Sequence, residues 1–193
     1  MARNRLKTIS SKSLLNINPS LAKEWHPTKN ASLTPLNVTP GSAKKVWWVC
    51  SKGHEWQAIV SNRINGSGCP YCCGKAVCYD NCLQTMNPCL AKQWHPNKNG
   101  PLTPYDVTPG SHVRVWWFCS KGHSWEATIL GRSYGTGCPY CAGKAVCQEN
   151  CLKTLNQKLA NEWHPTKNNS LTAYDVTPNS NNKVWWVCNK GHE

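Results

Sequence analysis

Apolar and polar residues follow the same order three times along this 193-residue chain, at a step of 69 residues. Each copy opens on a short apolar segment, of which NPSLAKEWHP (18–27) is the first example. Asn18 can cap a helix, Pro19 can occupy its first position and Pro27 can stop it, so we expect a helix of about two turns. Residues 28–45 are rich in Thr, Asn, Pro and Gly and predict an ordered loop of successive turns.

The remainder of each copy has the residues expected of a β-hairpin. In the first copy, VWWVC (46–50) and EWQAIVSNRI (55–64) predict two strands joined by a tight turn. A Gly-rich turn, NGSG (65–68), and the segment CPYC (69–72) follow. The pattern therefore predicts a helix, a long loop and a hairpin in every copy.

Because the copies follow one another without insertion or deletion, the repeat is the predicted unit of structure. We predict a basic N-terminal segment at residues 1–9, a first module at 10–78 and a second module at 79–147. The third module, at 148–193, is incomplete because it lacks a second cysteine pair.

Eleven tryptophans against one phenylalanine are the main source of aromatic area in the chain. Successive strand residues point to opposite faces, so Trp48 shares a face with Cys50 while Trp47 lies on the other. We expect Trp48 to form a small core with Trp25 and Trp56. Stacking on the bases of single-stranded nucleic acid is the alternative role, and it is strongest for Trp47.

The 13 cysteines raise a choice between disulfides and metal binding. We see neither the apolar core of a signal peptide nor an apolar stretch of membrane-spanning length, so we expect a cytoplasmic, reducing location without a membrane. In that setting, cysteines close to histidines favour metal. The predicted ligands are Cys50, His54, Cys69 and Cys72 in the first module and Cys119, His123, Cys138 and Cys141 in the second.

Within each set, the two ligand pairs are separated by fourteen residues, a length that suits a β-hairpin. Three cysteines and one histidine are typical of structural zinc, so we predict two zinc ions per chain. Four protein ligands leave no position for a catalytic water, and no small-molecule substrate is evident, so we predict that the chain is not an enzyme. In the third module, Cys188 and His192 form an incomplete site.

The formal charge is +13 and is concentrated at the N-terminal end, where residues 1–78 carry 11 basic and 2 acidic groups. This balance favours a polyanionic partner, above all nucleic acid. Several basic positions recur at the step of 69 residues and can line up across the modules. The candidate phosphate contacts are Lys44, Lys45, Lys52, Arg63, Lys75, Arg114, Lys121, Arg132 and Lys144.

Two further patterns recur. Cys78 and Cys82, repeated at Cys147 and Cys151, are expected to be small buried residues, with a second zinc site as the weaker alternative. The histidine of each WHP segment, His26 in the first copy, is expected to make a structural hydrogen bond.

The segments EWHPTKN, VWWVC, GHEW and GCPYC resemble those of a family of tandem treble-clef zinc finger repeats, also described as zinc ribbons, of unknown function. The resemblance covers nearly the whole chain and implies the same eight zinc ligands. It also implies small zinc-stabilised α+β modules in tandem, each with a treble-clef or zinc-ribbon-like β-hairpin, two zinc knuckles and a short helix.

The leading functional hypothesis is a structural zinc-binding repeat protein that binds nucleic acid, DNA first, through basic faces with little sequence specificity. A zinc-stapled array that binds a protein partner is the alternative. A third hypothesis follows from the resemblance, because members of the family are sometimes joined to nuclease-like domains. It makes this chain an accessory part of a nuclease whose catalytic domain lies elsewhere.

Overall fold

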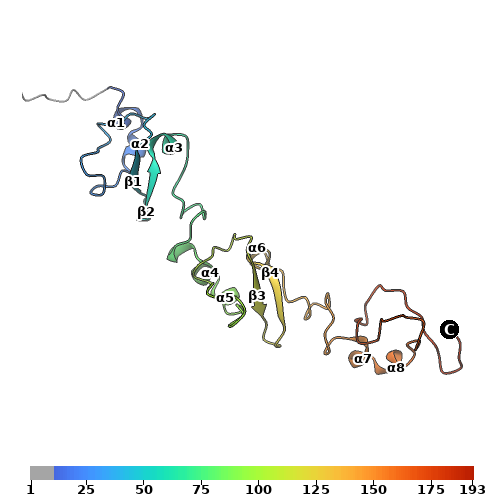
Figure 1. Cartoon of the computed structure of the whole chain (residues 1–193). Coiled ribbons are helices and arrows are strands. Elements are labelled where there is room, and N and C mark those ends of the chain that lie inside the picture. Colours follow the sequence, from blue (N-terminus) through green and yellow to red (C-terminus); the bar gives the residue numbers. More distant parts are fainter. Residues whose placement is uncertain (1–10) are drawn as a thin grey trace, which may run out of the picture. The chain divides into compact units, whose positions relative to one another are not determined.

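A computed structural model describes residues 11–193, so the predicted basic segment at residues 1–9 lies outside the described residues (Figure 1). The chain divides into two compact units, with the boundary between Asn81 and Cys82. Within the described residues, buried apolar side chains form three separate clusters, one for each copy of the repeat. None of the described helices is long and apolar enough to cross a membrane.

Each copy begins with a pair of one-turn helices. The pairs are α1 (Leu14–Ile17) with α2 (Pro19–Ala22), α4 (Leu83–Met86) with α5 (Pro88–Ala91), and α7 (Leu152–Leu155) with α8 (Gln157–Ala160). A short 3₁₀ helix, η1 (Tyr79–Asn81), precedes the second pair.

The start of the predicted helix is confirmed, but its length is wrong. Asn18 caps α2 by accepting a hydrogen bond from the N–H of Leu21, and Pro19 is the first helical residue. The helix ends at Ala22, after one turn, because the chain then turns to pair with a strand. The N–H of Val49 donates to the Glu24 carbonyl at 2.8 Å, and Trp25 forms a β-bridge with Trp48.

The first helix of each pair was not expected from the sequence. In α1, the Ser13 hydroxyl accepts a hydrogen bond from the N–H of Asn16, and Leu14 is fully buried. The N–H of Leu14 also donates to the carbonyl of Val38 at 2.8 Å, so the long loop lies against this helix. The predicted ordered loop is confirmed, since its turns are hydrogen-bonded and Val38 is buried in the core.

The first two copies each contain an antiparallel hairpin. In the first, β1 (Lys45–Val49) pairs with β2 (Glu55–Ile59), and Trp48 lies opposite Trp56. In the second, β3 (Arg114–Phe118) pairs with β4 (Ser124–Thr128) in the same register.

The second predicted strand, residues 55–64, is wrong in its second half. Helix α3 (Val60–Ile64) follows β2 directly, and α6 (Ile129–Ser133) follows β4. Val60 and Arg63 are both buried, and residues three apart share one face of a helix, so helical geometry turns both side chains into the core.

Tryptophan rings dominate each core, as predicted. Trp25 and Trp48 pack edge to face with their ring centroids 5.4 Å apart, and Trp56 is buried in the same cluster. The second and third copies have the same edge-to-face pair. In the third copy, the described strand pairing is limited to the bridge between Trp163 and Trp186, and its core is correspondingly small.

Candidate metal centre

The four predicted ligands of the first copy converge on one point. Cys50 and His54 lie in the turn between β1 and β2, and Cys69 and Cys72 lie in the loop after α3. The Nδ1 atom of His54 lies 3.5 Å from Cys50 Sγ, 3.7 Å from Cys69 Sγ and 3.3 Å from Cys72 Sγ. The Sγ atoms of Cys50 and Cys72 are 3.8 Å apart.

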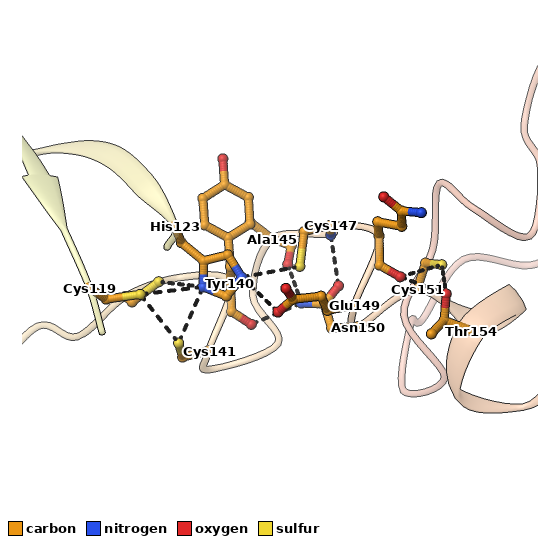
Figure 2. Close-up of polar contacts among 12 residues, drawn as sticks. Cys119, His123, Tyr140, Cys141, Ala145, Cys147, Glu149, Asn150, Cys151 and Thr154 are labelled. Atoms are coloured by element: carbon orange, nitrogen blue, oxygen red, sulfur yellow. Dashed lines mark hydrogen bonds and ion pairs between the residues drawn. The ribbon is translucent and has the colours of Figure 1, made fainter. Parts of the chain in front are cut away.

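The second copy repeats this geometry. The Nδ1 atom of His123 lies 3.4 Å from Cys119 Sγ, 3.6 Å from Cys138 Sγ and 3.4 Å from Cys141 Sγ. The Sγ atoms of Cys119 and Cys141 are again 3.8 Å apart. Figure 2 shows the cysteine sulfurs gathered around one edge of the His123 ring.

These distances fit a tetrahedral zinc ion. With zinc–sulfur and zinc–nitrogen bonds of about 2.3 and 2.0–2.1 Å, tetrahedral ligands stand about 3.8 Å apart for two sulfurs and about 3.6 Å apart for sulfur and nitrogen. Each histidine presents its Nδ1 atom to the three sulfurs, so each centre has the Cys₃His donor set of structural zinc.

A tight turn prepares the first ligand pair for this geometry. The N–H of Gly53 donates to the Cys50 carbonyl at 2.9 Å, and the N–H of Cys50 donates to the His54 carbonyl at 3.1 Å. Gly53 has a φ of 81°, a left-handed conformation that residues with a Cβ atom rarely adopt. The spacing Cys-x3-His therefore requires the glycine that precedes the histidine.

The turn also tunes the thiols. Partial burial raises the pKa of Cys50. Hydrogen bonds from the backbone at Lys52 and His54 and from two neighbouring thiols outweigh this effect and lower the pKa to about 7. Desolvation of the thiol by its neighbours, together with the thiols of Cys69 and Cys50, raises the pKa of Cys72 to about 11. The second centre shows the same division between Cys119, with a pKa of about 7, and Cys141, with a pKa of about 11.

Two of the candidate phosphate contacts lie inside the modules, so Arg63 and Arg132 must be removed from that set. The guanidinium of Arg63 lies between the rings of Trp48 and Trp56, at 5.2 and 5.1 Å from their centroids, and is bonded to Glu24. Only 7% of the surface of each arginine is exposed.

Arg132 has the same aromatic neighbours in the second copy, Trp117 and Trp125. Burial lowers the pKa of its guanidinium, while the sulfurs of Cys138 and Cys119 raise it. The guanidinium thus supplies positive charge beside the cysteines of the second centre. The other seven cationic candidates are exposed, namely Lys44, Lys45, Lys52, Lys75, Arg114, Lys121 and Lys144.

The predicted structural role of His26 is confirmed. Its Nδ1 atom accepts hydrogen bonds from the backbone N–H groups of Thr28 and Lys29, so the ring proton is on Nε2 and is donated to Glu55 at 2.8 Å. The Lys29 ammonium also contacts the Glu55 carboxylate. This network ties the WHP segment to β2 and leaves the histidine buried.

Within each of the two additional cysteine pairs, Cys78 with Cys82 and Cys147 with Cys151, the two sulfurs have different neighbours, so the pair does not act as one set of ligands for the second zinc site that was the weaker alternative. Cys82 and Cys151 are fully buried, as expected, and their sulfurs lie next to threonine hydroxyls. For Cys78 and Cys147 the expectation of burial is wrong, because both are half-buried and lie 3.6 Å from the outer nitrogens of His54 and His123. The recurrence of these cysteines indicated a role, but the sequence did not reveal their partner because the histidine lies 24 residues away in the chain.

The third copy forms only the first ligand pair. The N–H of Cys188 donates to the His192 carbonyl at 3.0 Å, and the N–H of Gly191 donates to the Cys188 carbonyl at 2.9 Å, as in the complete centres. Among the described residues, the full Cys₃His grouping occurs twice.

Each complete centre thus takes one ligand pair from the turn inside a β-hairpin and the other from the loop after the following helix, an arrangement that fits a small zinc finger. A family model described as "Probable Treble clef zinc finger domain" matches residues 21–75, 90–144 and 159–193. These ranges cover most of the chain, which therefore belongs to this family of treble-clef zinc finger repeats. No curated protein matches the chain.

Proposed function

We propose that this chain is a non-enzymatic protein with two structural zinc ions, whose basic faces bind nucleic acid, DNA first, with little base specificity. Zinc at the two Cys₃His centres would staple modules whose apolar cores are small. All four ligands at each centre come from the protein, so the proposal assigns zinc no catalytic step.

The recurrence of exposed cations at equivalent positions supports nucleic-acid binding. Lys45 and Arg114 begin β1 and β3, at one end of each hairpin. Lys52 and Lys121 lie in the ligand turns at the other end, and both are exposed. A five-residue strand spans about 17 Å, so each hairpin carries positive charge at two separated points, an arrangement suited to a phosphate backbone.

The test measures binding of the zinc-loaded chain to labelled duplex DNA, single-stranded DNA and RNA of unrelated sequences by fluorescence anisotropy. On duplex DNA, the logarithm of the binding constant should fall linearly with the logarithm of salt concentration, with a slope of about −0.9 per neutralised phosphate. Removing two phosphate contacts with Lys52→Ala and Lys121→Ala should reduce the steepness by about 2.

The matched control for each single substitution is Lys158→Ala, which removes one positive charge from an exposed position in α8 that does not recur as a cation in the other copies. Binding that is undetectable at low salt, or that does not respond to salt, would refute the proposal. Cleavage of DNA that requires added Mg²⁺ and is lost on changing His26 and His95 would refute the non-enzymatic part.

A recurrent apolar surface favours a second candidate, a zinc-stapled array that binds a protein. Ile17, Met86 and Leu155 occupy equivalent positions at the ends of α1, α4 and α7 and are 60%, 61% and 59% exposed. Beside each of these helices runs the long loop, which exposes Leu36, Tyr105 and Tyr174 at 39%, 54% and 57%.

One set of variants distinguishes nucleic-acid binding from protein binding. If the apolar surface binds a protein, Ile17→Ser with Met86→Ser should abolish capture of that protein and leave the salt dependence of DNA binding unchanged. If those variants weaken DNA binding as much as the lysine variants do, the apolar side chains belong to the nucleic-acid surface instead.

A further inference from the structure

The outer nitrogen of each zinc-facing histidine meets a thiol and a carboxylate that the zinc ligand set does not use. In the first copy, His54 Nε2 lies 3.6 Å from Cys78 Sγ and 3.2 Å from Asp80 Oδ2. The His54 side chain is only 12% exposed, so its Nε2–H group has few other acceptors within reach.

The second copy has the same arrangement. His123 Nε2 lies 3.6 Å from Cys147 Sγ and 3.4 Å from Glu149 Oε2. Figure 2 shows Cys147 and Glu149 on the side of the His123 ring that faces away from the cysteine ligands. Asp80 and Glu149 are equivalent positions of the repeat, so a carboxylate is present although its side-chain length differs.

Hydrogen bonds between one asparagine side chain and the backbone place this segment independently of the exposed carboxylate. In the first copy, the Asn81 amide donates to the carbonyls of Tyr71 and Ala76 at 2.7 and 2.8 Å and accepts from the N–H of Cys78 at 2.8 Å. Asn150 makes the same three bonds in the second copy. We call residues 78–81 and 147–150 the clasps, because each ties the chain back to the loop that carries the second cysteine pair.

We propose that each clasp positions the zinc-ligating histidine, with Asp80 in the first centre and Glu149 in the second accepting the proton of Nε2–H. A histidine that binds zinc through Nδ1 carries its proton on Nε2. A carboxylate acceptor at that nitrogen fixes the ring orientation and makes Nδ1 a stronger donor to the metal. The thiols of Cys78 and Cys147 are weaker acceptors and cover the same ring edge.

A different role for the same atoms is a second metal site. The donor atoms of His123, Cys147 and Glu149 lie within 4.8 Å of one another, as the ligands of one ion would. Such an ion would displace the Nε2 proton and make the imidazole a bridge between two metals. The positioning role requires no loss of that proton, and metal stoichiometry separates the two roles.

The test compares Asp80→Asn and Glu149→Gln in the full zinc-loaded chain, with zinc release to a colorimetric chelator as the first readout. Loss of such an outer partner typically weakens metal binding 10–100-fold. Since the two carboxylates are 62% and 68% exposed, we expect the low end, about 10-fold faster release from the altered centre. The unaltered centre in the same chain is the internal reference.

A second readout follows the histidine itself. Long-range ¹H–¹⁵N spectra of the imidazole should show the Nε2–H resonance of His54 move in Asp80→Asn while that of His123 stays in place. Exchange of the two carboxylates, Asp80→Glu with Glu149→Asp, should leave both Nε2–H resonances in place and the rate of zinc release unchanged. Glu126→Gln removes an exposed carboxylate from β4 and should change neither readout.

Zinc release at the unaltered rate together with an unmoved Nε2–H resonance in both variants would overturn the proposal. It would also be overturned by a titration that finds extra metal ions per chain and loses them on Cys147→Ser, because the clasp would then be a metal site. Neither outcome depends on whether the chain binds nucleic acid.

Discussion

The buried arginines offer a matched pair of substitutions, because the two complete modules differ at one partner. Arg63 contacts the carboxylate of Glu24, whereas Arg132 contacts the amide oxygen of Gln93 at the equivalent position. We therefore predict that Gln93→Glu stabilises the second module and that Glu24→Gln destabilises the first. The two changes should be similar in size and opposite in sign.

The magnitude follows from how far solvent screens the pair. Two unit charges about 4 Å apart attract by about 4 kcal/mol at intermediate screening, but fully exposed pairs contribute about 0.2–1 kcal/mol. The Arg63 side chain is 5% exposed and the Glu24 side chain is 38% exposed, which places this pair between the two limits. We expect each substitution to change the free energy of unfolding of its module by about 1–2 kcal/mol. For a module of this size, each kcal/mol shifts the thermal unfolding midpoint by about 4–8 °C.

Hydrogen exchange of the zinc-loaded chain, read by mass spectrometry, is the appropriate assay because it reports each module separately. Tryptophan fluorescence would mix the modules. Protection of the hairpin amides should rise in the second module with Gln93→Glu and fall in the first with Glu24→Gln. If Gln93→Glu lowers protection or leaves it unchanged, the thiolates of Cys119 and Cys138 already neutralise Arg132, and the reasoning fails.

Three further predictions concern the zinc centres. Replacement of Gly53 by Ala forces a Cβ atom into a left-handed turn, with φ of 81°, and should destabilise the turn by about 1–2 kcal/mol. Chelator competition should then show roughly tenfold weaker zinc binding at the first centre. Equal weakening at both centres would contradict a local effect. The thiol of Cys72, with a pKa of about 11, still carries its proton at pH 8 and must release it to the metal. Zinc affinity should therefore fall by about tenfold or more per pH unit as pH is lowered from 8 to 7, and a flat profile would show that the thiol is already ionised. Chelation of zinc should unfold the first two modules, as measured by hydrogen exchange. Residues 152–160 should exchange at the same rate before and after chelation, because the described third copy has one ligand pair. A change in their exchange rate would show that metal also organises the third copy.

Features that depend on short-range geometry were predictable from the sequence. The members of each ligand pair are three or four positions apart, so local turns determine how they approach one another, with Gly53 in the turn of Cys50 and His54. The repeat at a step of 69 residues then identified the second centre. The cap at Asn18 was predictable for the same reason, because a helix start depends on three or four neighbouring residues.

Features that depend on distant partners were not. By composition, residues 60–64 suit a strand. They form a helix because this conformation buries Val60 and Arg63 on one face. Arg63 has the composition of a surface cation, but two tryptophan rings and a carboxylate 39 residues away hold it in the core. The contact of Cys78 and Asp80 with His54 likewise joins positions 24 and 26 residues apart.

By itself, the sequence determined the repeat, the eight ligands of the two complete centres and the positive charge of the chain, because spacing and composition are local or additive properties. Tertiary structure alone decided which cations remain on the surface, how α3 and α6 are formed, and which groups meet the outer edge of each histidine. These depend on side chains that approach one another only when the hairpin, the long loop and the clasp close around the zinc-binding cysteines.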